Sequence, residues 1–518
     1  MGIVQNVTRE NWDIGWMERA MFSILNKDRV IEYSNEIPVF LQDLNANVII
    51  ESITDDWGEE ASNMFLKLPE SKETEDYRRD VFNEMKEEEN RSIFFDFSER
   101  MRQKGICKER GGIVNDSLQK QVWFIRETAF YVNALEKLSE QIKNKDYKSE
   151  GLNGLKSFLE KYMSGEKYAS FRDETIELNN ELMGYRLRIT YKDDSVIISE
   201  GMGKGEYSEF LNAFFTDNNR RFKSPFMSSL DIGPLETQII VRFAKQHKAF
   251  FEKAEKFYEK YRSYENDEVM LFHRELKYYI SFAGFINKMS EFGYRFCRPD
   301  KSEKSLYATG LYDLALACIS LKEGRSAKVI ANDTRLEEGE DFFVLTGPNQ
   351  GGKTTFARSL GQLVYFTKMG LDVPAVSAAV PYYSDILTHF EVEESTETGR
   401  GKLMDELVRL RPMMAEEQES SFVVINELFT TAANYDACIM GKKVISRFIE
   451  KKCKGIYVTH LNELSKAAPT VVSLRAMLGE NHTRTFKIER SEAEEIAGAN
   501  KQAEKYRLTY SQLKERFS

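Results

Sequence analysis

Long amphipathic stretches dominate the first 300 residues of this 518-residue chain. Apolar residues recur there at positions i, i+3, i+4 and i+7 between Glu and Lys, which is the pattern of a helix with one buried face. The pattern predicts long helices at residues 77–89, 119–145 and 237–286. The pair Asp267-Glu268 marks a break before a following helix, so that an antiparallel pair of helices is expected in the last stretch.

The last stretch also carries a row of mostly aromatic residues. Its members are spaced four and three apart: Phe243, His247, Phe250, Ala254, Phe257, Tyr261 and Tyr264. Aromatic residues among lysines are also compatible with stacking on nucleic-acid bases. The helical spacing favours packing against a partner helix over base stacking.

Two departures from the helical pattern follow along the chain. Alternating polar and apolar residues at 185–199 predict a β hairpin that turns around Asp193-Asp194-Ser195. From about Tyr307 onward, short β-prone runs at 327–331, 342–345, 422–425 and 455–459 alternate with helical segments. That alternation indicates an α/β domain with a mostly parallel sheet. We therefore expect a helical region over residues 1–300, with a small hairpin near 185–200, and an α/β domain over residues 301–518.

Composition narrows the class of protein. The net charge of −10 gives no general attraction to nucleic acid, although it leaves room for a local basic groove. Five scattered cysteines without a C-x-x-C pair favour a reducing, cytoplasmic compartment and predict neither a disulfide framework nor structural zinc. We expect no membrane partner, because no run of about 18 uncharged apolar residues occurs, and the N-terminus lacks the pattern of a signal peptide.

The strongest chemical signal is a glycine-rich segment between a β-prone run and a helical run. Gly347-Pro-Asn-Gln-Gly-Gly-Lys-Thr354 fits the pattern G-x-x-x-x-G-K-[ST]. Backbone N–H groups of such a loop bind phosphates, the lysine reaches the β- and γ-phosphates, and the hydroxyl binds Mg²⁺. A chance glycine-rich turn is the alternative, and the strand and helix on either side oppose it. The predicted nucleotide-binding residues are Gly347, Pro348, Asn349, Gln350, Gly351, Gly352, Lys353, Thr354 and Thr355, with ATP and Mg²⁺ as cofactors.

Two further β-prone runs end in polar residues suited to phosphate chemistry. Asn426 and Glu427 follow the run 422–425, where an ATPase of this kind places an Mg²⁺-side acid and a carboxylate that activates water. Asn426 brings no charge to the metal, and its alternative role is to cap the end of a strand. His460 follows the run 455–459, where an imidazole can contact the γ-phosphate; a purely structural histidine is its alternative. Glu427, His460 and Lys353 are the predicted catalytic residues, and Thr354 and Asn426 the predicted metal ligands.

A polar loop at 393–402 opens a helix at Leu403. It contains Gly399, Arg400, Gly401 and Lys402, and from the residues alone it is either an exposed connection or a helix N-terminus presented to a phosphate.

Taken together, these segments resemble the MutS family of ABC-type ATPases over residues 307–517. The loop at 346–355 is similar to the family sequence TGPNxGGKST, and 329–333, with Asn332, is similar to its V-x-N-D segment beside the adenine. The segment 399–406 aligns with its signature loop SGxSTFxxEM. The resemblance implies a core and lever of long helices joined to the ATPase, and a homodimer in which Gly399, Arg400, Gly401 and Lys402 complete the partner's nucleotide site.

The chain also departs from the family pattern. It has no room for the N-terminal mismatch-reading domain, and Phe257-Tyr258-Glu259, which spells that domain's Phe-x-Glu motif, lies within a helical stretch and is interpreted as coincidence. The family's Asp-Glu pair is Asn426-Glu427 here. The first hypothesis is an ATP-dependent, dimeric DNA clamp. The second is an ATP-gated switch or scaffold for proteins, with slow hydrolysis and no DNA binding.

Overall fold

The computed structural model describes most of the chain in two compact units. The described residues are 22–27, 35–185, 187–192, 195–200, 234–324, 329–391, 401–415, 418–480, 483–491, 512, 514 and 516. Unit 1 comprises residues 1–20, 25–83 and 277–518, and unit 2 comprises residues 21–24 and 84–276. This division differs from the expected boundary at residue 300, because an N-terminal segment packs with the C-terminal part of the chain.

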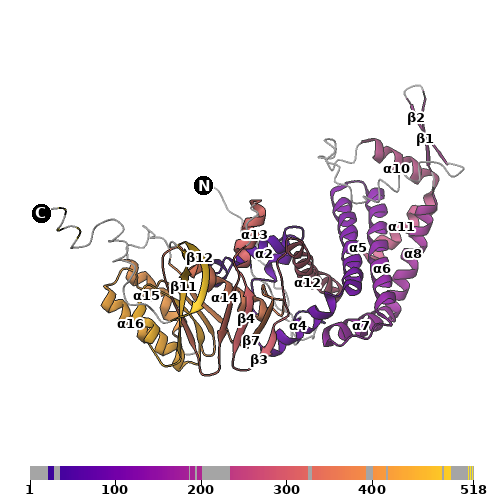
Figure 1. Cartoon of the computed structure of the whole chain (residues 1–518). Coiled ribbons are helices and arrows are strands. Elements are labelled where there is room, and N and C mark those ends of the chain that lie inside the picture. Colours follow the sequence, from indigo (N-terminus) through magenta and orange to yellow (C-terminus); the bar gives the residue numbers. More distant parts are fainter. Residues whose placement is uncertain are drawn as a thin grey trace, which may run out of the picture. The chain divides into compact units, whose positions relative to one another are not determined.

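Unit 2 is helical (Figure 1). Its helices are α5 (Glu88–Ile113), α6 (Ser117–Ile142), α7 (Glu150–Met163), α8 (Glu166–Gly184), α10 (Pro234–Gln246) and α11 (Lys248–Tyr261), and α12 (Asp267–Glu291) begins there. The predicted hairpin is confirmed as the antiparallel pair β1 (Leu187–Lys192) and β2 (Ser195–Glu200). The predicted helix over 119–145 is α6, and the predicted break at Asp267 is the start of α12.

Two of the predicted helical stretches are divided more finely. The stretch 237–286 contains three helices. Besides the expected break before Asp267, the backbone leaves the helical region at His247 (φ −119°, ψ 48°) between α10 and α11. The stretch 77–89 spans the end of α4 (Lys72–Met85) and the start of α5. The spacing of Phe243, His247, Phe250 and Ala254 continues through the break at His247, so the pattern alone did not reveal it.

The aromatic row packs in the core of unit 2, as its spacing predicted. Phe243, Phe250, Ala254 and Phe257 are buried. The ring of Phe257 lies 5.7 Å from that of Phe124 on α6 and 6.3 Å from that of Phe171 on α8. Base stacking is therefore excluded for the buried members of the row. Phe257, the phenylalanine of the Phe-x-Glu motif, is a core residue.

Unit 1 contains a six-stranded sheet in the order β12-β11-β6-β10-β9-β8. Its strands are β6 (Phe342–Thr346), β8 (Ile386–His389), β9 (Phe422–Asn426), β10 (Lys454–Val458), β11 (Val471–Leu478) and β12 (Arg484–Arg490). All neighbours are parallel except β11 and β12, which confirms a mostly parallel sheet. Parallel strands are covered on both faces and read as continuous apolar runs, and this is why β6, β9 and β10 were visible in the sequence.

A second, four-stranded sheet has the order β3-β7-β4-β5. Its strands are β3 (Asp300–Ser302), β4 (Leu306–Leu311), β5 (Asn332–Leu336) and β7 (Ser377–Pro381). The predicted strand at 327–331 is wrong for residues 329–331, which precede β5, and residues 327–328 lie outside the described part. Strand β5 is polar and alternates in burial, so its position is set by antiparallel pairing with β4 rather than by an apolar run.

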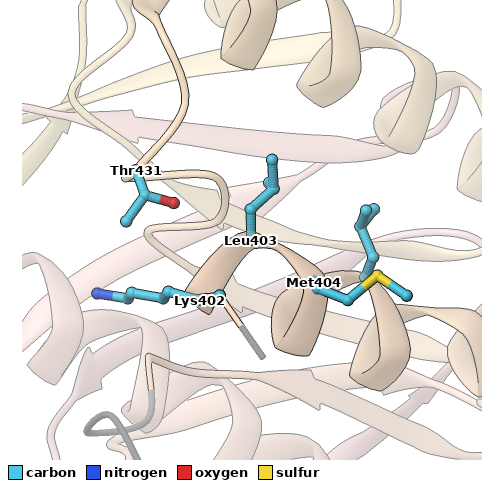
Figure 2. Close-up of a pocket in the computed structure, with 6 residues that line it drawn as sticks. Lys402, Leu403, Met404 and Thr431 are labelled. Carbon is cyan, nitrogen blue, oxygen red and sulfur yellow. The ribbon is translucent and has the colours of Figure 1, made fainter. Parts of the chain in front are cut away.

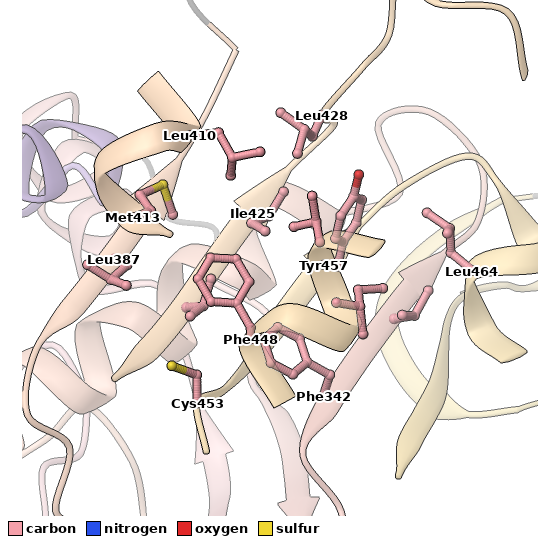
Figure 3. Packing of buried hydrophobic residues seen from close by; sticks show 14 of the residues in the cluster. Phe342, Leu387, Leu410, Met413, Ile425, Leu428, Phe448, Cys453, Tyr457 and Leu464 are labelled. Carbon is pink, nitrogen blue, oxygen red and sulfur yellow. The ribbon is translucent and has the colours of Figure 1, made fainter. Parts of the chain in front are cut away.

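One face of the six-stranded sheet packs against α15 (Lys402–Met413) and α16 (Asn434–Glu450). Figure 3 shows this core, where Leu410 and Met413 of α15 and Phe448 of α16 lie over Ile425 and Phe342 of the sheet. The neighbouring buried residues of each strand point to the opposite face. The helix α14 (Lys353–Lys368), which contacts β8, β9 and β10, is almost entirely buried.

The N-terminal helices of unit 1 explain why residues 25–83 belong with it. These are α1 (Val39–Asp43), α2 (Ala46–Thr54), α3 (Glu59–Asn63) and α4, and α13 (Leu314–Lys322) packs on α2. Side chains of α14 bind backbone carbonyls at or just after the ends of α1 and α3. Arg358 Nε donates to Asp43 O at 2.9 Å, Gln362 Nε2 to Leu44 O at 3.0 Å and Tyr365 Oη to Phe65 O at 2.7 Å. Over the described residues, no helix combines the length and the apolar character needed to span a membrane.

Two glycines that follow helices test how closely α14 packs on α4. Gly370 (φ +76°) follows α14, and a Cβ there would lie 2.7 Å from Arg78 Cβ and 2.8 Å from Arg79 N. Gly324 (φ +66°) follows α13 and has open space. Both Gly→Ala changes incur about 1 kcal/mol of backbone strain, and Gly370→Ala adds about 1–3 kcal/mol of overpacking. We expect urea unfolding to show a clearly larger loss of stability for Gly370→Ala; equal losses would contradict this packing.

Candidate functional site

The glycine-rich segment forms a loop between β6 and α14, in the order that the sequence predicted. Helix α14 begins at Lys353, and Gly352 precedes it with φ +89°. Gly347 has φ +132°, and a Cβ there would lie 2.9 Å from Ala476 Cβ and 3.1 Å from Ala476 N. A side chain at Gly347 would therefore have to displace β11, whereas glycine permits the close approach.

A cavity of about 530 Å³ opens beside this loop. Its polar lining includes Asn349, Gln350, Lys353, Thr354 and Glu427. Its volume falls within the range of roughly 300–1,000 Å³ that is typical of small-molecule sites.

The cavity also has an apolar lining. Leu311, Tyr312, Leu316 and Ile330 contribute to it, together with Phe486 of β12. A cavity lined by both polar and apolar side chains suits a ligand that carries both a charged chain and a flat apolar ring.

Lys353 and Thr354 lie at the first turn of α14. The Lys353 amine donates hydrogen bonds to Gly347 O at 2.9 Å and Pro348 O at 3.3 Å, inside the curl of the loop. Burial lowers the pKa of Lys353, and the charge of Glu427 opposes that shift. Thr354 Oγ1 donates to Asn426 Oδ1 at 3.0 Å, so the two predicted metal ligands are neighbours. Hydroxyl and amide oxygens belong to the hard donor set that Mg²⁺ takes, and the pair fits such an ion.

Glu427 and His460 form a second close pair. Glu427 follows β9 with φ +55°, and its Oε1 lies 2.9 Å from Nε2 of His460, which follows β10. The hydrogen bond from His460 is the largest cause that lowers the pKa of Glu427; burial raises it, and the charges of His460 and Lys353 lower it further. Glu427 therefore carries its negative charge beside the loop at neutral pH. The three predicted catalytic residues thus come together at one edge of the sheet.

Asn332 and Phe486 also line the cavity and are connected by a hydrogen bond. Asn332 Nδ2 donates to Phe486 O at 3.1 Å, and Asn332 Oδ1 accepts from Ile488 N at 2.9 Å. Phe486 is 43% exposed, with φ +56°, and packs within 3.4 Å of the Cβ position at Gly352. The predicted ligand-binding residue Asn332 therefore lines the cavity and also fixes β12. Sequence reasoning missed Phe486, since a single aromatic residue in a polar strand has no periodic signal.

The predicted signature-loop residues lie elsewhere. Gly399 and Arg400 fall outside the described residues. Gly401 and Lys402 are absent from the described lining of the cavity and border a separate surface hollow of about 510 Å³. Figure 2 shows residues that line this hollow: Leu403 lies between Thr431 and Met404, and Lys402 points away from Met404. Lys402 forms an ion pair with Glu391.

Comparisons with known proteins agree with this geometry. Residues 343–501 match the family model of MutS domain V. The chain is 28% identical over 182 residues to the DNA mismatch repair protein spellchecker 1 of Drosophila melanogaster, covering 35% of this chain and 20% of that protein. It is 28% identical over 196 residues to the DNA mismatch repair protein MutS of Streptococcus gordonii, covering 35% of this chain and 23% of that protein. The chain thus matches about a fifth of the length of these relatives.

The pair of Glu427 and His460 predicts a pH-dependent stability. The folded pKa of Glu427 lies below its unfolded value of about 4.3, so the pair stabilises the fold fully above that value and less as the pH falls through the folded pKa. His460→Ala removes the main cause of the shift. We expect the difference in urea midpoint between wild type and His460→Ala to be full above about pH 5 and to shrink as the pH falls below about pH 4. A difference that is constant with pH would contradict the assignment.

Proposed function

Residues 343–501 are a MutS domain V, and from this premise we propose that the chain is an ATPase of the MutS type that acts as a dimeric, DNA-binding clamp. The observation that carries the proposal is the convergence of Lys353, Thr354, Asn426, Glu427 and His460 at one edge of the sheet, beside a cavity of nucleotide size.

Nucleotide binding follows from the polar and the apolar lining of the cavity. Backbone N–H groups of the loop and the N-terminus of α14 attract the phosphates. Lys353 exchanges its contacts with Gly347 O and Pro348 O for the β- and γ-phosphates. Phe486, which Asn332 holds in place through the backbone of β12, offers a ring for the base. We therefore expect ATP to bind with its base toward β12.

Hydrolysis requires a group that positions water near the γ-phosphate. Glu427 is ionised, lines the cavity and receives a hydrogen bond from His460, which fits a water-orienting base whose direction the imidazole fixes. Thr354 and Asn426 would hold Mg²⁺, which neutralises phosphate charge when it is bound. Because Asn426 is a neutral amide, it contributes no charge to the metal, and slow turnover is consistent with this.

A second copy of the chain completes the site in this proposal. Gly401 and Lys402 border a hollow that shares no described lining residue with the nucleotide cavity. The helix that they open exposes apolar side chains: Met404 is 53%, Leu407 40% and Val408 44% exposed. If Gly401 and Lys402 contact the nucleotide of a partner subunit, their absence from the described lining of the chain's own cavity and the exposed apolar side chains of α15 are both explained. The same arrangement explains the implied homodimer.

DNA binding is proposed from the long helices of unit 2, which suit a lever, and from the family to which domain V belongs. The relatives are named as mismatch repair proteins, but the matched part covers about a fifth of their length, and mismatch recognition is not part of the proposal. Asn426 and the net charge of −10 favour the second candidate, an ATP-gated scaffold for proteins without DNA binding.

Two substitutions separate binding from hydrolysis. We expect Lys353→Ala to weaken ATP binding at least about tenfold, because it removes a charge-assisted contact to phosphate. We expect Glu427→Gln to bind ATP nearly as wild type, to lower turnover roughly 100-fold and to favour the dimer. Equilibrium titration with ATP, phosphate release and sedimentation measure these effects. Lys304→Ala, an exposed lysine paired with Glu338, is the control. Unchanged ATP affinity in Lys353→Ala would refute the site.

DNA binding is tested by ATP turnover with and without linear and four-way-junction DNA across a salt series. For a clamp, DNA changes turnover, and the response weakens as salt rises, because phosphate contacts release counterions. Turnover that is indifferent to every DNA at low salt, with ATP still bound, would favour the scaffold.

A further inference from the structure

The segment that carries Glu427 has an unusual backbone. Glu427 (φ +55°) and Phe429 (φ +65°) are both left-handed, although neither is glycine. A left-handed residue other than glycine costs about 1–2 kcal/mol, so surrounding contacts must hold the segment in this conformation. Two hydrogen bonds from backbone N–H groups do so. Glu427 N donates to Val458 O at 3.0 Å, and Phe429 N donates to Glu406 Oε2 at 3.1 Å.

Glu406 is buried, although Met404, Leu407 and Val408 on the same helix are exposed. It lies on the second turn of α15 and is 6% exposed. Its Oε1 has no hydrogen-bond partner among the described residues, so the N–H of Phe429 is the main compensation that the structure shows for burying this carboxyl. Burial raises the pKa of Glu406, and the N–H of Phe429 opposes the shift. A carboxyl placed here at such a cost indicates a specific role in holding the segment 427–429.

Helix α15 is fixed again about one turn further along. Arg409 donates to Phe390 O at 2.8 Å and to Asp43 Oδ2 at 3.3 Å, and Asp43 Oδ2 also accepts from Thr388 at 2.7 Å. Arg409 is thus one fixed position of α15, and Gly401 and Lys402 lie at the N-terminal end of the helix. Glu406 lies between that end and Arg409.

We propose that Glu406 is a positioning residue that couples helix α15 to the catalytic carboxylate Glu427. The inference rests on the proposed function, in which Gly401 and Lys402 meet the partner's nucleotide. A phosphate at the N-terminus of α15 shifts that end of the helix, Glu406 carries the shift to the backbone of Phe429, and Glu427, two residues earlier, changes its position beside the glycine-rich loop. Each subunit thereby adjusts its own hydrolysis to the nucleotide of its partner.

The first test measures the segment itself and needs no ATPase activity. Amide hydrogen exchange of peptides covering residues 427–432 is compared in the nucleotide-free full chain. Glu406→Asp keeps the charge but is too short to reach Phe429 N, and Glu406→Ala removes the acceptor; both should speed exchange at least about tenfold. Glu406→Gln keeps an acceptor and should stay within about twofold of wild type, as should the control Arg411→Ala, which is exposed on the same helix. Equal exchange in all variants overturns the proposal.

The second test measures turnover. Glu406→Asp should lower kcat about tenfold with the KM for ATP within about twofold, and Glu406→Gln should retain at least about half of the wild-type kcat. Asp serves as the principal variant if Ala fails to fold. Loss of kcat in Gln equal to that in Asp overturns the role of the acceptor.

The coupling between the N-terminal end of α15 and Glu427 is tested by a double-mutant cycle that combines Glu406→Asp with Lys402→Ala. If α15 acts on Glu427 through Glu406, the combined loss of kcat is at least about threefold smaller than the product of the single losses. Strictly multiplicative losses overturn the coupling. A wild type without any ATP turnover contradicts the proposed function instead, and the exchange measurement still decides whether Glu406 holds the segment.

Discussion

The alignment of three parallel strand ends determines the candidate site. Val458 of β10 is in register with Leu345 of β6 and with Asn426 of β9. The glycine-rich loop, the Asn426-Glu427 pair and His460 therefore leave the sheet at the same level. Thr354 hydrogen-bonds Asn426 there, and Glu427 pairs with His460. A shift of one residue in either ladder would turn every side chain of the shifted strand to the opposite face. Helices pack on both faces of the sheet, so such a shift would place the side chains of the strand against neighbours that do not fit them.

Left-handed residues direct the chain around the cavity. Gln350, Glu427 and Phe486 have positive φ angles without being glycine, and each borders the cavity. Such conformations persist only where neighbouring contacts compensate for them. Here the compensating contacts come from distant segments: Asn332 holds the backbone around Phe486, and Val458 and Glu406 hold the segment that includes Glu427.

The helix that follows the glycine-rich loop links the site to the N-terminal part of unit 1. Arg358, Gln362 and Tyr365 of α14 bind carbonyls of residues 43, 44 and 65. Burial raises the pKa of Asp43, and Thr388, Arg409 and Arg358 oppose the shift. One short N-terminal segment thus contacts the helix after the glycine-rich loop, the strand β8 and the helix α15. Removing it would leave several polar groups of unit 1 unpaired and buried, which is costly in a protein interior.

The sequence determined the features that depend on local patterns. Continuous apolar runs predicted β6, β9 and β10, and helical spacing placed Phe250 and Phe257 in a core. The pattern of glycine, lysine and threonine located the loop. Each of these features requires particular residue types at short spacing. Tertiary structure alone decided the position of β5, the break at His247, the packing of residues 25–83 with unit 1, and the roles of Phe486 and Glu406. These depend on contacts between residues far apart in the chain: Asn332 meets Phe486, and Glu406 meets Phe429, through backbone groups that any residue possesses. A backbone N–H or C=O leaves no mark on the residue type, so the sequence by itself does not reveal its partner.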